Sequence, residues 1–130
     1  MVLKGAGTVI LNENNEILLI KRHGTSTFNQ LWANPGGKTE PGETQEEAAI
    51  RETKEELNID VETIKPLGTY EDIKDGQLIG EYSGFLVKII NGELKILDPK
   101  IAEIKYFKIH DLPSNLAPYT KLYIKNLQSN

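Results

Sequence analysis

The sequence predicts an α+β protein of the α/β/α sandwich type, in which helices flank a mixed β-sheet. Apolar runs typical of strands precede and follow a strongly marked helix at residues 44–57, and a second helical pattern lies near residue 120. Strands placed before, between and after helices are typical of a sheet that helices cover. The length of 130 residues favours one compact domain spanning residues 1–130.

The first predicted element is a β-hairpin. Two apolar runs, residues 6–11 and 16–20, flank the Asn-rich segment 12–15, and Asn tolerates the positive φ that tight turns require. Three shorter features are expected next: a polar loop at residues 23–29, a short strand at residues 31–33 and a turn at residues 35–37.

The helix predicted at residues 44–57 carries signals at both ends. Thr44 and Glu47 have the spacing of a capping box at its start. Asn58 follows the last helical residue, where Gly or Asn in the left-handed conformation is common.

The later elements have weaker signals. Strands are expected near residues 64–70, 81–90 and 101–108, with Asn91 and Gly92 as a turn. A last helix is expected from about Pro118 to Leu127, and its predicted buried residues are Leu122, Tyr123 and Leu127.

Composition excludes several classes of protein. The chain has no cysteine, which excludes a disulfide framework and a Cys-ligated metal centre, and its two histidines, His23 and His110, are far apart. It has no apolar run long enough to span a bilayer and no signal-peptide pattern at its first residues. We therefore expect a cytoplasmic protein without a membrane partner.

The formal net charge of −4 is unevenly distributed. Residues 38–60 hold eight acidic and three basic residues, so this segment carries −5 and the rest of the chain +1. An acidic cluster argues against binding of a nucleic-acid polymer, which needs positive charge. The cluster could form a divalent-cation site or only a solvated helix face.

Helical geometry groups three of these acids. At about 100° per residue, Glu52, Glu55 and Glu56 fall on one face of the predicted helix, and they repel each other unless a cation lies nearby. Thr53 and Leu57 fall in another sector. The pattern predicts an apolar stripe against the sheet and a triple-carboxylate face that points away from it.

The spacing of these acids matches a known motif. The string is Gly37-x5-Glu43-x7-Arg51-Glu52-Thr53-x-Glu55-Glu56-x-Asn58-Ile59. It resembles the Nudix box, Gly-x5-Glu-x7-Arg-Glu-U-x-Glu-Glu-x-Gly-U, in which U is aliphatic. Two positions depart from the box: Thr53 replaces an aliphatic residue, and Asn58 replaces the second glycine.

The resemblance extends beyond the box to the MutT-like branch of the Nudix family. Segments 17–22, 32–43 and 107–113 resemble the strand before the box, the entry to its loop and a late strand and corner. The chain also has only two arginines, Arg22 and Arg51, and both stand where the family pattern favours a planar, permanently charged group.

The resemblance implies an enzyme, a Mg²⁺-dependent pyrophosphohydrolase that cleaves nucleoside triphosphates to nucleoside monophosphate and pyrophosphate. Mn²⁺ could replace Mg²⁺, and sanitation of the nucleotide pool is one role to consider. The implied partner is a small-molecule nucleotide, and the protein could be a monomer or a homodimer. The main alternative is a pyrophosphatase of ADP-ribose or another nucleotide sugar. A non-catalytic, nucleotide-sensing module is the third.

The resemblance also implies residue roles. Glu52, Glu55 and Glu56 are the expected catalytic residues and metal ligands, with Glu52 a candidate general base. The carbonyl of Gly36 and the carboxylate of Glu103 are further candidate ligands. Asp98 is a rival to Glu103, which could equally be a solvent-facing strand residue.

Other residues are expected to bind substrate or to shape the box. The expected substrate-binding residues are Arg22, Asn34, Gly36, Gly37 and Lys38. Gly37, Glu43 and Arg51 are expected to be structural. Asn34 could read a base edge or only bond to the turn, and Trp32 could stack on a base or lie in the core. Tyr70, Tyr82 and Tyr119 are expected to serve packing.

Overall fold

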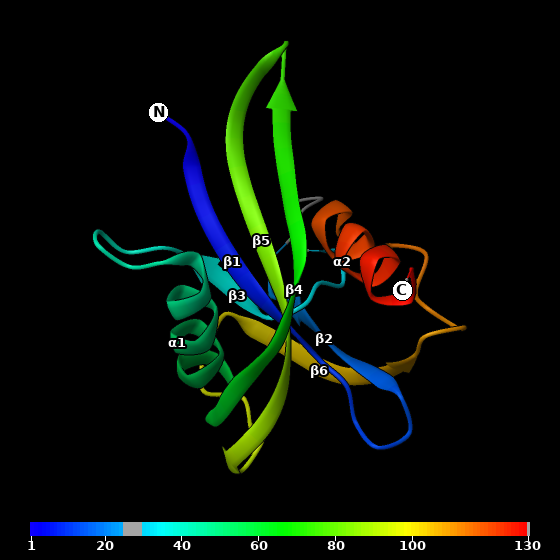
Figure 1. Cartoon of the computed structure of the whole chain (residues 1–130). Coiled ribbons are helices and arrows are strands. Elements are labelled where there is room, and N and C mark those ends of the chain that lie inside the picture. The colour runs from blue at the N-terminus through cyan, green and yellow to red at the C-terminus, as the bar shows by residue number, and fades with distance from the viewer. Residues whose placement is uncertain (25–29, 130) are drawn as a thin grey trace.

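The computed structural model describes residues 1–24 and 30–129 and contains six strands and two helices within these ranges (Figure 1). In chain order they are β1 (Leu3–Ile10), β2 (Glu16–Arg22), β3 (Gly36–Lys38), α1 (Gln45–Leu57), β4 (Ile59–Lys74), β5 (Gln77–Gly92), β6 (Ile101–Lys108) and α2 (Pro118–Gln128). Of the polar loop predicted at residues 23–29, residues 25–29 lie outside the described ranges.

The strands form two sheets. One is a mixed four-stranded sheet in the order β3-β1-β5-β4, where β1 runs parallel to β5 and antiparallel to β3. The other pairs β2 with β6. Figure 1 shows α1 and α2 on opposite sides of these strands, so the predicted α+β fold with a mixed sheet and flanking helices is confirmed. No helix in the described ranges has the length and hydrophobicity needed to cross a bilayer.

The hairpin predicted from the first two strands is wrong. The Asn-rich turn forms, since the Asn12 side chain accepts the backbone N–H groups of Asn14 and Glu16, but β1 and β2 then join different sheets. Only one bridge, Leu11 to Ile17, links their ends. The physical reason is burial: residues 5–10 and 17–20 are buried without alternation, so both faces of each strand must be covered.

Two smaller strand predictions also need correction. Asn91 and Gly92 are the last residues of β5 rather than a turn, and the chain reverses instead at Asp75 and Gly76, whose φ values are 52° and 78°. Two consecutive positive φ angles suit a tight hairpin, for which Asp-Gly is a favoured pair. The strand predicted at residues 31–33 consists only of isolated bridges from Trp32 and Ala33.

Both predicted helices are confirmed. The capping box forms at the start of α1, where Thr44 accepts the Glu47 N–H and the Glu47 carboxylate accepts the Thr44 N–H. Asn58 ends the helix in the left-handed conformation, with φ of 65°. In α2, Tyr123 is buried as predicted and Leu127 packs partly against the core, whereas Leu122 is only half-buried and Ile124 is buried in its place.

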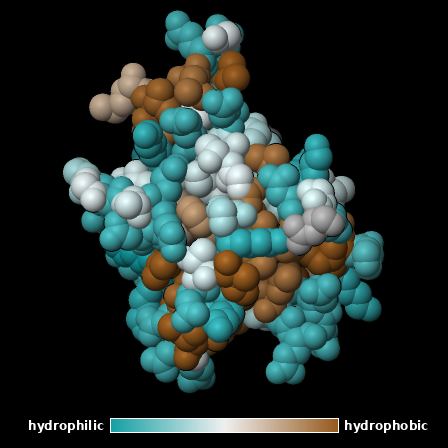
Figure 2. All heavy atoms as spheres, viewed as in Figure 1, coloured by the Kyte–Doolittle hydropathy of each residue, from teal (hydrophilic) through white to brown (hydrophobic). Residues whose placement is uncertain are grey.

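The core fixes the position of the sheets relative to each other. Trp32 belongs to this core, where its ring meets the edge of Phe107 with centroids 4.9 Å apart. Exposed apolar side chains lie at several places, among them Ile73 and Leu78 at the tip of the β4–β5 hairpin and Ile89 and Ile90 near the end of β5. Figure 2 shows apolar atoms at the hairpin tip.

Candidate active site

The carboxylates of α1 do not share one exposed face. The side chains of Glu52 and Glu55 are 20% and 57% exposed, whereas that of Glu56 is 4% exposed. The prediction that all three point away from the sheets is therefore wrong for Glu56. Helical periodicity could not reveal the cause, which is that Glu56 faces β3 and the end of β2.

Glu56 is held by two different strands. Its Oε2 accepts a hydrogen bond from Arg22 Nη2 at 2.7 Å, and its Oε1 accepts the Gly36 N–H at 3.1 Å. Burial nevertheless raises the pKa of Glu56 above its ordinary value, although the hydrogen bond and charge of Arg22 and the Gly36 N–H oppose that shift. The fold thus holds the Glu56 carboxylate where its negative charge is energetically unfavourable.

Arg51 binds the other carboxylates of the box. Its Nε and Nη2 donate to Glu43 at 2.7 and 2.9 Å, and its Nη1 donates to Glu52 at 2.8 Å and to Glu55 at 3.0 Å. Its Nη2 also donates to the Lys38 carbonyl at 3.0 Å. The hydrogen bond from Arg51 lowers the pKa of Glu43 to about 2. These contacts join the loop before α1 to the helix.

The short strand β3 passes very close to α1 because two of its three residues are glycines. A Cβ placed on Gly37 would collide with the Glu52 carboxylate, and one placed on Gly36 would collide with the Ala6 carbonyl. Gly37 therefore leaves room beside Glu52, and Gly36 presents its backbone N–H to Glu56.

The donor set fits a hard divalent cation. Glu52, Glu55, Glu56 and the Gly36 carbonyl offer oxygen ligands only, which Mg²⁺ and Mn²⁺ prefer. Within the described ranges, however, no three His, Asp or Glu residues converge as metal ligands. The two arginines explain this, since Arg51 draws Glu52 and Glu55 to one side while Arg22 holds Glu56 on the other.

The candidate ligands from outside the box lie in different surroundings. Glu103 is exposed on β6, opposite Lys21 in the register with β2. Asp98 lies 3.8 Å from Arg22, so it is the carboxylate that the fold brings to the Arg22–Glu56 pair.

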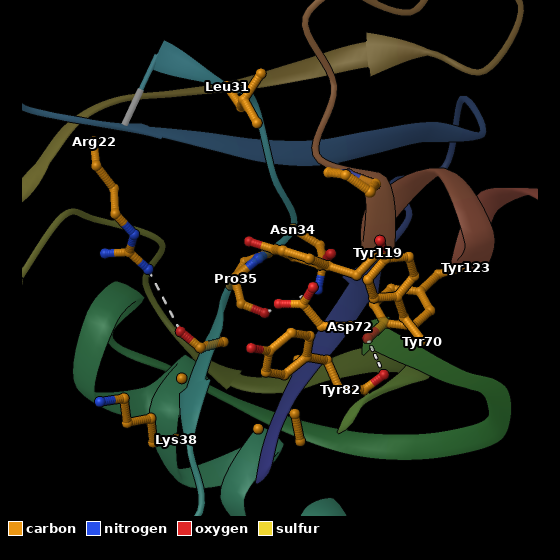
Figure 3. A pocket seen from close by; sticks show the side chains of 16 residues that line it. Arg22, Leu31, Asn34, Pro35, Lys38, Tyr70, Asp72, Tyr82, Tyr119 and Tyr123 are labelled. Atoms are coloured by element: carbon orange, nitrogen blue, oxygen red, sulfur yellow. Dashed lines mark hydrogen bonds between the residues drawn. The ribbon is translucent and has the colours of Figure 1, made fainter. Parts of the chain in front are cut away.

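A pocket of about 550 Å³ opens beside this pair (Figure 3). All five residues predicted to bind substrate line it: Arg22, Asn34, Gly36, Gly37 and Lys38. In the view of Figure 3, Arg22 and Lys38 lie at the left, apart from the tyrosines. The pocket thus has a cationic end next to the box carboxylates.

Asn34 is fixed in the wall of this pocket. Its Oδ1 accepts a hydrogen bond from Thr120 at 2.6 Å, and its Nδ2 donates to the Pro35 carbonyl at 3.1 Å. Of the two alternatives for Asn34, the structure shows a side chain that bonds to the turn.

Sequence reasoning assigned the tyrosines to packing and did not place them in the site. Tyr70, Tyr82, Tyr119 and Tyr123 all line the pocket, and the rings of Tyr82 and Tyr119 meet edge to face with centroids 5.9 Å apart. Burial raises the pKa of Tyr119 to about 12, so its hydroxyl stays protonated at neutral pH. The alternation of side chains along a strand could have grouped Tyr70 with Asp72, because these residues of β4 are two positions apart and share one face.

Comparison with known proteins identifies the class. The family model of the NUDIX domain matches residues 1–127. The chain therefore belongs to the Nudix family, and it is a hydrolase of the class that acts on phosphoric anhydride bonds. Hydrolases of this family are generally dependent on divalent metals.

Individual relatives support the MutT-like resemblance. A putative 8-oxo-dGTP diphosphatase of Bacillus subtilis is 32% identical over 99% of this chain and 82% of its own length. An ADP-ribose pyrophosphatase of Methanocaldococcus jannaschii is 36% identical over 87% of this chain and 66% of its own length. The structure of a MutT Nudix hydrolase from Burkholderia pseudomallei superposes with a TM-score of 0.87 and 27% identity, covering 98% of this chain and 99% of that one.

Proposed function

We propose that this chain is a Mg²⁺-dependent pyrophosphohydrolase that cleaves nucleoside triphosphates to nucleoside monophosphate and pyrophosphate, with Mn²⁺ as an alternative cation and nucleotide-pool sanitation as its role. The observation that carries the proposal is the pocket of about 550 Å³, whose cationic end, with Arg22 and Lys38, adjoins the buried Glu56 carboxylate. That volume is within the range of small-molecule sites, and an aromatic wall suits a nucleobase.

The box residues would hold the cation. Glu52, Glu55, Glu56 and the Gly36 carbonyl are the proposed ligands, and Glu103 is a further candidate. When bound, the cation neutralises phosphate charge, polarises a phosphoryl oxygen and lowers the pKa of an attacking water.

The other residues of the site bind and orient. Arg22 and Lys38 place positive charge at the pocket end where the phosphates would lie. Glu52 is the proposed general base or water-orienting residue, because it is partly exposed beside the gap that Gly37 leaves. Arg51 and Glu43 keep the loop against α1, and Asn34 and Gly37 shape the wall.

Hydrolysis of ADP-ribose or another nucleotide sugar is the second candidate. The relative from Methanocaldococcus jannaschii, which is named an ADP-ribose pyrophosphatase, supports it. Both candidates use the same box, so the products distinguish them.

The test is a panel of nucleoside triphosphates, ADP-ribose and a nucleotide sugar, each with Mg²⁺, with Mn²⁺ and with EDTA. We expect pyrophosphate from triphosphates and no turnover in EDTA. Ribose phosphate from ADP-ribose with intact triphosphates would select the second candidate. A folded protein that turns over nothing in the panel would contradict both. Glu46→Gln, on an exposed residue of α1 at a variable position of the box, is the matched control for variants of the fixed box acids.

A further inference from the structure

The face of the sheet below the pocket is unevenly covered. Across the strands, one set of residues in register is Lys38, Gly5, Tyr82 and Tyr70. The next set toward the box is formed only by Gly36, Gly7 and Gly84. Side chains therefore rise from one part of this face and are missing from the next, where Asn34 and Tyr123 pack directly over Gly7 and Gly84.

The pocket wall formed by Tyr70 and Tyr82 (the tyrosine wall) also contains a carboxylate, on the side nearer the tip of the β4–β5 hairpin. Asp72 stands in register with Gly80, on the strand that carries Tyr70. A Cβ on Gly80 would collide with the Tyr82 hydroxyl, so the glycine lets Tyr82 lie along the strand toward Asp72. Burial, and then the charge of Asp72 and a hydrogen bond to it, raise the pKa of the Tyr82 hydroxyl. Asp72 thus lines the pocket together with Tyr82 (Figure 3).

The acidic and basic residues that line the pocket lie at different ends of it. Among the described residues that line it, Asp72 is the one acid, and Arg22 and Lys38 are the two cations. Arg22 is paired with Glu56 and lies 3.8 Å from Asp98, so its charge is largely balanced. A triphosphate is repelled by Asp72, whereas Lys38 and the cation proposed for the box would attract it at the other end, so the phosphates belong beside the box. The base then lies at the tyrosine wall, within reach of Asp72.

We propose that Asp72 is a specificity-determining residue that selects a guanine-type base, so that the preferred substrates are guanine nucleotides. This inference rests on the proposed function. An ionised carboxylate only accepts hydrogen bonds, and it pairs best with two adjacent donors. The N1–H and 2-amino groups of guanine form such an edge. Adenine and cytosine each place an acceptor beside their amino group, and uracil has one donor between two acceptors. Oxidation at C8 leaves the guanine edge unchanged.

The decisive variant is Asp72→Asn, which keeps the size of the side chain and its ability to accept from Tyr82. Its amide offers one donor and one acceptor, which match adenine. We expect kcat/KM for dGTP to fall by about ten- to a hundredfold, the usual range for loss of a bidentate base contact, while that for dATP stays equal or rises. Glu71→Gln is the matched control, because it makes the same charge change on the opposite face of β4 and should leave the dGTP to dATP ratio unchanged.

A second measurement needs no variant. The base of dITP keeps N1–H but lacks the 2-amino group, so the unmodified protein should prefer dGTP to dITP, and Asp72→Asn should narrow that preference. An equal loss for all bases in Asp72→Asn, or no preference of the unmodified protein for dGTP over dITP, would overturn the assignment.

Calorimetric binding of GMP and AMP separates this inference from the proposed function. If triphosphates are not hydrolysed but GMP binds more tightly than AMP and Asp72→Asn removes the difference, the proposed function fails and the base assignment stands. If triphosphates are hydrolysed and GMP and AMP bind equally, only the base assignment fails.

Discussion

The two arginines of the chain contact carboxylates of the same helix in opposite surroundings. Arg51, on the outer side of α1, pairs with four carboxylates and a carbonyl, all at least partly exposed, and Glu43 has a pKa lowered to about 2. Arg22, at the pocket, binds the buried carboxylate of Glu56, whose pKa is raised, and lies 3.8 Å from Asp98. The outer group therefore favours its charged form in the folded state, and the pocket group does not.

The difference separates stability from chemistry within one motif. A lowered carboxylate pKa means that folding favours the ionised form, so the Arg51 cluster stabilises the loop–helix junction. The raised pKa of Glu56 means that its burial is not fully offset by Arg22, so its charge opposes folding at neutral pH. Such a group is expected where function requires it.

The largest effect is expected from Glu56→Gln. The amide can still accept the Gly36 N–H, but it loses the charge that we assign to cation binding, so kcat should fall by about a hundredfold or more. The melting temperature in EDTA should stay equal or rise, because a desolvated charge is removed. Glu46→Gln should change neither quantity much. Full activity in Glu56→Gln would show that the pocket pair is not part of the chemistry.

Replacing each arginine by lysine keeps the positive charge and tests the difference between the two arginines. Arg51→Lys loses the planar group that reaches several partners at once, so the free energy of unfolding should fall by about 1–2 kcal/mol. Arg22→Lys should lower kcat/KM by roughly tenfold with a smaller change in melting temperature, because its contacts are fewer and adjoin the pocket. Urea denaturation and steady-state kinetics on both variants measure the two effects. A larger loss of stability in Arg22→Lys together with a larger loss of kcat/KM in Arg51→Lys would contradict the separation of stability from chemistry.

A third side of α1 faces β1 and is expected to matter only for stability. Thr53 donates to the Ala49 carbonyl at 2.8 Å, so the hydrogen bond of 2.8 Å between Thr53 and Thr8 must be donated by Thr8. Thr53→Val leaves the buried Thr8 hydroxyl without its acceptor and should cost about 1–2 kcal/mol. Adding Thr8→Val should recover part of that loss, with kcat unchanged throughout. A double variant no more stable than Thr53→Val alone would contradict this account.

The parts of the fold that could be predicted are those with local causes. The start and end of α1 depend on Thr44, Glu47 and Asn58, which act on backbone groups a few residues away. The Nudix box was found for the same reason, since its acids are fixed within one loop and one helix.

The parts that could not be predicted depend on pairing between distant strands. The direction of Glu56 is set by Arg22, 34 residues earlier in the chain, and by Gly36. The tyrosine wall arises from the register that places Tyr70 opposite Tyr82. Alternation along β4 and β5 was visible in the sequence, but which face would meet the box was not.

The smallest effect is expected from Glu43→Gln, which removes one partner of Arg51 and leaves its others in place. The folded-state pKa of Glu43 is about 2 against an ordinary value of 4.5, so its stabilising contribution is complete above pH 4.5 and is lost as pH falls toward 2. The unmodified protein should therefore be more stable than the variant at pH 7, and the difference should shrink between pH 4.5 and 3. Urea denaturation at pH 7, 5, 4 and 3 measures it. In an Arg51→Met background the same exchange should have little effect at any pH, and a difference that grows as pH falls would refute the role of this ion pair.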